Sequence, residues 1–220
     1  MLSTWLLWLE RLSSSRAPQL TAGLTVCGLL VLVLGDHPLA LLPFLLQRGL
    51  VIALLWSALR LPLGSISGIA SIAIALLLIS AELWRWISRR WTGPAVQAAR
   101  PSAPGWPIRA LGAALALLLA NGLLRVELVQ RLPPAVAEAA VPLCVSGLLM
   151  LLLADSGWLT GFGVLSLADG LRVGYALWQP DPLCWGLWAA SDVIVALGTA
   201  HLRRLQQHVA QPTPAERGWP

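Results

Sequence analysis

The stretch from Trp158 to Arg204 decides how this chain folds: it reads WLTGFGVLSLADGLRVGYALW, then QPDP, then LCWGLWAASDVIVALGTAHLRR. Each side of the proline-containing break is an apolar run of about 20 residues, which is long enough to cross a bilayer as a helix. Charged residues nevertheless lie near the middle of both runs, Asp169 and Arg172 in the first and Asp192 in the second. A charge at mid-bilayer costs roughly 2.5–3.5 kcal/mol, so it usually faces protein or water. These charges are the main clue to function.

The composition places most of the chain in lipid. Of its 220 residues, 57% are hydrophobic and 11% are charged, and the mean hydropathy is +0.75, whereas soluble domains have about 25% charged residues. The net charge of +5 is not gathered into a basic-aromatic surface of the kind that binds nucleic acid. The three cysteines are scattered, with neither a disulfide framework nor metal-ligand spacing. We therefore expect an all-α, polytopic integral membrane bundle.

Apolar runs of spanning length predict about seven transmembrane helices within residues 18–204. They cover residues 18–35, 39–59, 64–86, 109–128, 135–154, 158–178 and 183–204. Residues 1–17 are too short an apolar stretch to span and predict an interfacial segment. Residues 87–108 form a long, basic, Pro-, Gly- and Ala-rich loop, and residues 205–220 a mobile polar tail. Tryptophans near the predicted span ends indicate interfacial belts: Trp86, Trp91, Trp158, Trp178 and Trp185.

The distribution of arginine predicts the orientation. An odd number of spans places the 87–108 loop and the C-terminus on the same side of the membrane. Both segments are rich in arginine, so the positive-inside rule assigns them to the cytoplasm and the N-terminus to the outside. The predicted location is therefore the inner or plasma membrane, as a multi-pass protein with a cytoplasmic C-terminus.

Small residues predict two helix-packing faces. Gly64 and Gly68 lie on one face of the third span together with serines and an alanine, which lets membrane helices approach closely. Gly170 and Gly174 have the G-x-x-x-G spacing in the sixth span and predict a second such face.

Four charges fall at similar depth: Arg48 in the second span, Asp169 and Arg172 in the sixth, and Asp192 in the seventh. Asp169 and Arg172 are three residues apart on one helical face and can pair directly. If Arg48 faces Asp192, the set sums to zero, which is how buried charge is normally tolerated. Two interpretations remain open. The set is either a hydrated polar pathway along which protons or other ions could step, or two ion pairs that fix the register of the helices.

Asp192 is the strongest single candidate for function. Its own helix has Trp188 and Ala189 three and four residues before it, and Val195 and Ala196 after it. No basic partner is therefore within reach along the helix, and the charge must be met by another helix, by water or by protonation. A carboxyl group in that position can take up and release protons, as a relay requires.

Motifs of soluble enzymes are missing: the chain has no glycine-rich phosphate loop, no nucleophile elbow and no His/Cys cluster. We expect no catalytic site of its own, no cofactor and no metal. At most, the chain would be a non-catalytic subunit of an oxidoreductase complex.

The last two spans resemble the hydrogenase-4 component E family of group 4 membrane-bound hydrogenases, which is related to a small subunit of complex I and of multisubunit cation/proton antiporters. The matching positions are Ala168-Asp169-Gly170, Tyr175-Ala176-Leu177-Trp178, the following proline turn, Asp192 and, earlier in the chain, Phe44-Leu45-Leu46-Gln47. The resemblance covers about a third of the chain. It departs from the family at Ala168 and Gly186, where the family has glutamates.

The resemblance implies an integral membrane subunit of a proton-linked hydrogenase or complex I-like assembly. Its partners would be the lipid bilayer and antiporter-like membrane subunits, with the redox chemistry elsewhere. A stand-alone small transporter with the four charges as its site is the first alternative. A scaffold or assembly protein without a transport role is the second.

Overall fold

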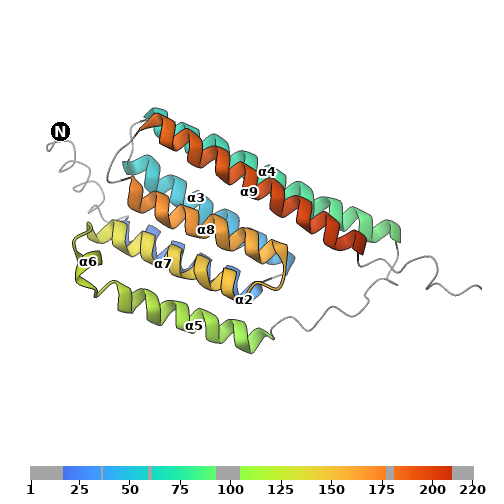
Figure 1. Cartoon of the computed structure of the whole chain (residues 1–220), viewed down its shortest axis with the longest axis horizontal. Helices are drawn as coiled ribbons and strands as arrows, with labels where there is room; N and C mark the ends of the chain where they lie inside the picture. The colour runs from blue at the N-terminus through green and yellow to red at the C-terminus, as the bar shows by residue number, and fades with distance from the viewer. Residues whose placement is uncertain (1–16, 36, 59–60, 93–104, 177–180, 210–220) are drawn as a thin grey trace, which may run out of the picture.

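The computed structural model describes residues 17–35, 37–58, 61–92, 105–176 and 181–209, and this part of the chain is a bundle of helices without strands (Figure 1). Its long helices are α2 (Ala17–Leu34), α3 (Leu41–Ala58), α4 (Leu61–Thr92), α5 (Trp106–Leu123), α7 (Pro134–Leu152), α8 (Gly157–Tyr175) and α9 (Pro182–Val209). A short 3-10 helix, η1 (Pro38–Ala40), precedes α3, and the four-residue α6 (Glu127–Gln130) precedes α7. The predicted all-α class is confirmed.

Several of these helices have the length and composition to cross a membrane. Five segments of the described residues qualify: Pro38–Leu55, Ser67–Trp84, Trp106–Leu123, Pro134–Leu152 and Pro182–Leu202. The apolar part of α2, Pro18–Leu34, is shorter, and α8, which carries two charges, is not among the five. The chain is thus a membrane-type helical bundle, and seven crossings stay a prediction.

The helices form two layers (Figure 1). In one layer α7, α8 and α9 lie side by side, and in the other α2, α3 and α4 do, so that α7 packs on α2, α8 on α3 and α9 on α4. Helix α5 covers the edge formed by α2 and α7. Helix α8 lies between two neighbours in its own layer and covers α3, and it carries two of the four mid-span charges, Asp169 and Arg172.

Successive long helices alternate in direction, so α4 and α9 end at the same end of the bundle, opposite the start of α2 (Figure 1). This agrees with the predicted placement of the 87–108 loop and the C-terminal segment on one side. Which of the two sides faces the cytoplasm stays a prediction.

Helix ends differ from the predicted span ends. Helix α4 continues to Thr92 and α5 begins at Trp106, so both ends of the predicted 87–108 loop are helical. Helix α9 continues to Val209, into the predicted 205–220 tail. Helix α5 stops at Leu123, before α6. An apolar run marks where lipid contact ends, whereas a helix continues wherever its residues tolerate it. Residues 1–16, 93–104 and 210–220 lie outside the described residues, and with them most of the predicted interfacial segment and of the tail.

Two tryptophans expected at the membrane interface are instead in the core. Trp158 and Trp185 are 0% and 1% exposed, because they lie on the inner faces of α8 and α9. The Trp158 and Phe162 rings are 4.8 Å apart, and Phe162 stacks on Phe44 of α3 at 4.3 Å. Trp86 is exposed, as a belt residue would be. The side chains of Trp91 and Trp178 lie outside the described part.

Glycines hold α7 against α8 at backbone contact. A Cβ on Gly147 of α7 would lie 2.8 Å from the carbonyl oxygen of Gly163 on α8, and a Cβ on Gly163 would lie 2.9 Å from the carbonyl oxygen of Gly147. A Cβ on Gly170 would lie 2.9 Å from the carbonyl oxygen of Ala140 on α7. This close approach needs residues without a side chain, and it fixes the position of α8 and of its charges.

Candidate functional site

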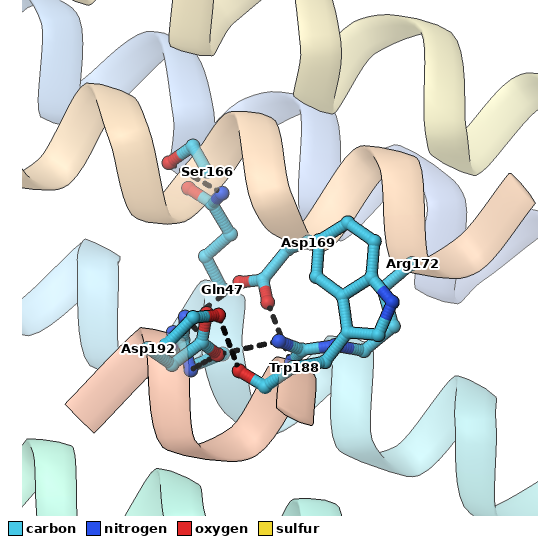
Figure 2. Close-up of polar contacts among 8 residues, drawn as sticks. Gln47, Ser166, Asp169, Arg172, Trp188 and Asp192 are labelled. Atoms are coloured by element: carbon cyan, nitrogen blue, oxygen red, sulfur yellow. Dashed lines mark hydrogen bonds and ion pairs between the residues drawn. The ribbon is translucent and has the colours of Figure 1, made fainter. Parts of the chain in front are cut away.

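The four mid-span charges come together in the interior of the bundle (Figure 2). Arg48 projects from α3, Asp169 and Arg172 from α8, and Asp192 from α9. Their side chains are between 1% and 3% exposed. Residues from three helices therefore meet at one point that is closed to the surroundings of the bundle. We call this set the charge ring.

Each arginine of the charge ring contacts both carboxylates. Both terminal nitrogens of Arg48 donate to Asp192 Oδ2 at 3.1 Å, and its Nε lies 3.3 Å from Asp169 Oδ2. Arg172 donates from Nη2 to Asp192 Oδ2 at 2.6 Å and from Nη1 to Asp169 Oδ1 at 3.3 Å. The ring is closed, with two positive and two negative groups, and sums to zero.

The predicted pairs are both present, and the ring adds two more. The i, i+3 pair of Asp169 with Arg172 forms on α8, and Arg48 meets Asp192. The cross-pairs of Arg48 with Asp169 and of Arg172 with Asp192 join these two pairs into one group. The charge of Asp192 is thus met from two other helices. Whether protons or other ions move through the ring stays a prediction.

Aromatic rings cover both guanidinium groups. The guanidinium carbon of Arg172 lies 5.6 Å from the centre of the Trp188 ring (Figure 2), and that of Arg48 lies 6.0 Å from the Phe44 ring. Trp188 is one helical turn before Asp192 on α9. Such contacts add cation–π attraction, which strengthens when water is excluded.

A second polar contact lies beside the ring. Gln47 Nε2 donates to Ser166 Oγ at 3.1 Å, and both residues are 0% exposed (Figure 2). Gln47 precedes Arg48, and Ser166 is three residues before Asp169, so each lies next to a ring residue on its own helix. Ser166 was missed by sequence reasoning. Its only signal was the i, i+3 spacing from Asp169, which a serine in an apolar helix shares with many packing residues.

One polar atom of the Gln47 side chain makes no hydrogen bond within the described structure. Its Oε1 has no hydrogen-bond partner among the described residues. That oxygen points toward α2, because a Cβ on Gly28 would lie 3.7 Å from it and 3.0 Å from Ser146 Oγ of α7. Polar side chains thus continue from the charge ring, through Gln47, toward the interface of α2 and α7.

The glycines predicted to pack helices behave differently from one another. Gly170 makes the close contact with α7 described above. A Cβ on Gly174 would meet nothing within 4 Å, so the expected packing contact is not seen at that position. Gly68 is half-buried in α4, and the surroundings of Gly64 lie outside the described residues.

A further ion pair lies at one end of the bundle. Arg109 of α5 donates from Nη2 to both carboxylate oxygens of Asp155 at 3.4 Å, in the turn between α7 and α8. The side chains are 7% and 28% exposed. Gly35, with a φ of 53° at the end of α2, faces the Arg109 guanidinium closely enough that a Cβ there would overlap it. The pair joins residues 46 positions apart, and sequence reasoning did not find it.

Metal binding finds no support in the part of the chain that the structure describes, where no three His, Cys, Asp or Glu residues group in a way that could hold an ion. The carboxylates of the charge ring already have arginine partners. The ring is therefore an arrangement in which buried charges of opposite sign compensate one another.

Comparison with known proteins gives no match: no protein-family model fits the chain, and no curated protein and no solved structure is significantly similar to it.

Proposed function

We propose that this protein is an integral membrane subunit of a proton-linked assembly of the hydrogenase or complex I type, in which the charge ring holds or couples a proton route. The observation that carries the proposal is the closed ring of four buried charges on α3, α8 and α9. The resemblance of the last two spans to hydrogenase-4 component E supports the choice of assembly.

The energetics of buried charge favour a role beyond stability. Replacing a buried ion-pair network by apolar residues of similar volume is often neutral or stabilising. Ionisable groups inside membrane spans commonly mark proton or ion pathways. Four such groups gathered at one point are therefore better explained by a functional requirement for charge than by packing. Asp192, which accepts from both arginines on one oxygen, is the group whose protonation would change the ring most.

The surroundings of the ring disfavour a stand-alone permease. A substrate site needs a cavity with polar groups that converge on it. Two hollows of the described structure, one of about 450 Å³ between α5, α7 and α8 and a smaller one between α2, α5 and α7, are lined by no charged residue. The scaffold alternative has one observation in its favour, because a fully paired ring also fixes the register of three helices.

The first test is the partner set. We expect purification in mild detergent to retain large antiporter-like membrane subunits and redox subunits, identified by mass spectrometry. Purification of this chain alone, with proton or substrate transport in liposomes, would support the permease instead.

The second test separates charge from structure. The double change Asp169→Leu, Arg172→Leu removes one charge of each sign and leaves Arg48 paired with Asp192. We expect the host complex to assemble while its proton movement, followed with a pH-sensitive dye in membrane vesicles, falls by roughly tenfold or more. The matched control is Arg109→Gln, Asp155→Asn, which removes the ion pair at the bundle end and should leave proton movement unchanged. Full proton movement in an assembled Asp169→Leu, Arg172→Leu complex would leave the ring a structural role only.

The single change Asp192→Asn, the simplest test of the residue favoured from sequence, is less clean. It leaves two arginines facing one carboxylate, so assembly itself is at risk. The double change avoids this because the remaining pair is neutral.

A further inference from the structure

An apolar groove runs along the outside of the bundle, away from the charge ring. It has a volume of about 450 Å³, within the range of about 300–1,000 Å³ typical of ligand sites. Its floor is α7 from Ala140 to Leu148, and its walls are the end of α5 and the stretch of α8 from Gly170 to Tyr175. In Figure 1 α7 lies between α5 and α8, the two helices that form these walls.

The groove has the dimensions and lining of a hydrocarbon site. Along α7 it extends over eight residue steps, or about 12 Å at 1.5 Å per residue. Its walls are leucines, valines, alanine and glycine, with Cys144 and Tyr175 as the least apolar members. Leu148 and Leu171 at its rim are 54% and 51% exposed. In a chain whose helices lie in a membrane, such a rim faces acyl chains.

Gly174 is what keeps the groove open. A Cβ at this position would meet nothing within 4 Å, whereas a Cβ on Gly170 would meet Cys144 Sγ at 2.6 Å. Gly170 thus lies at the contact between α7 and α8, whereas Gly174, one turn further on, lines the groove. The second glycine of the G-x-x-x-G pair shapes a surface and makes no helix contact there.

Two arginines are close in sequence to residues that line one end of the groove. Leu123 and Leu132 line it, and Arg125 and Arg131 lie two residues after the first and one residue before the second. Both arginines are exposed on the connection around α6. Glu127 is the acidic residue of the same connection, which therefore has two arginines and one glutamate, and Glu138 is exposed on α7 close to the same end. Basic side chains at the membrane surface attract anionic lipid headgroups.

We infer that this groove binds an anionic phospholipid, with an acyl chain lying on α7 between α5 and α8 and the phosphate near Arg125 and Arg131. The inference does not depend on the role of the charge ring. An uncharged lipid or a detergent would occupy the hydrocarbon part but gain nothing from the arginines.

The test uses the full chain, purified in detergent, delipidated and mixed with phosphatidylglycerol, phosphatidylcholine or diacylglycerol before native mass spectrometry. We expect phosphatidylglycerol to remain bound in preference to the other two. Gly174→Leu should lower the bound phosphatidylglycerol by roughly tenfold or more, because the isobutyl group takes the place of the acyl chain. The matched control is Gly198→Leu on α9, whose Cβ also meets nothing within 4 Å and which should bind as the wild type does.

The double change Arg125→Gln, Arg131→Gln tests the headgroup, and it should remove the preference for phosphatidylglycerol over phosphatidylcholine. Wild-type binding by Gly174→Leu would overturn the acyl-chain site, and equal binding of phosphatidylglycerol and diacylglycerol to the wild type would overturn the headgroup site. If Gly174→Leu fails to fold, photo-crosslinking of the wild type decides. Phosphatidylglycerol with a diazirine in its tail should label residues 140–148 or 170–175, and labelling confined to other segments would contradict the inference.

Discussion

Two arginine–aspartate sites of the described structure differ in depth, one buried and one partly exposed. The charge ring lies in mid-bundle, with side chains 1–3% exposed and a shortest contact of 2.6 Å. The Arg109–Asp155 pair lies at the bundle end, with Asp155 28% exposed and contacts of 3.4 Å. The ring joins three helices, whereas the end pair joins a helix to a turn.

The surroundings of an ion pair decide how much the loss of one partner lowers the free energy of unfolding. At the bundle end, the Asp155 side chain is 28% exposed and water can solvate its carboxylate, whereas the Arg109 side chain is only 7% exposed. In the ring, protein and aromatic side chains exclude water, so a lost partner leaves an uncompensated charge in a medium that cannot stabilise it. The same residue types should therefore give large mutational effects in one place and small ones in the other.

The largest effect is expected for Asp169→Asn, which leaves the ring with two positive groups and one negative group. Breaking a buried pair by removing one partner typically costs ~3–5 kcal/mol. We expect that loss in the free energy of unfolding, measured by denaturant titration in mixed micelles, together with a lower yield of monodisperse protein. A loss close to that of an exposed surface pair would show that water reaches the ring.

Gly35→Ala should cost less, about 1–2 kcal/mol from the left-handed backbone alone. Gly35 has a φ of 53°, and a Cβ there would overlap the Arg109 guanidinium, so the change also displaces the end pair. The readout is again the free energy of unfolding. Gly198→Ala is the matched control, because that glycine is helical with open space beside it and alanine should be neutral or stabilising there. Equal effects of the two changes would mean that the end of α2 is not constrained by its conformation.

Much of the fold follows from the sequence alone. Long apolar runs predicted the helical class, and each run corresponds to one long helix of the bundle. The pairing of Asp169 with Arg172 was also predictable, because i, i+3 spacing on a helix brings two side chains together whatever the tertiary structure. The contact between Arg48 and Asp192 joins residues 144 positions apart. The sequence could suggest this contact only because the four charges would then sum to zero.

Other features depended on which helix lies next to which. Trp158 and Trp185 are at span ends in the sequence, yet the helices around them enclose both rings. Gly170 and Gly174 look equivalent as a motif, but α7 covers only the first. Span length and spacing report distance along a helix, whereas burial depends on rotation about the helix axis and on the neighbours, which a single sequence does not fix.

Asp155→Asn should have a small effect, roughly 0–1 kcal/mol on the free energy of unfolding. Water already solvates the exposed Asp155 carboxylate in the wild type, so its attraction to Arg109 is weak, and the amide oxygen of the variant can still accept a hydrogen bond from Arg109. The difference between wild type and variant should shrink further between low salt and about 1 M salt, because mobile ions screen exposed charges. A large effect that is insensitive to salt would place this pair in the same class as the ring.

A similarly small effect on stability is expected for the double change Asp169→Leu, Arg172→Leu. It removes one carboxylate and one guanidinium together, so the ring stays neutral, and Arg48 keeps both of its 3.1 Å hydrogen bonds to Asp192. Leucines at these positions need no solvation, and such exchanges are often neutral or stabilising. We expect the free energy of unfolding to stay within about 1 kcal/mol of the wild type, well above that of Asp169→Asn in the same assay. If the double change destabilises as much as the single one, Asp169 and Arg172 do not compensate each other, and the ring would have to be divided into the pairs of Arg48 with Asp169 and of Arg172 with Asp192.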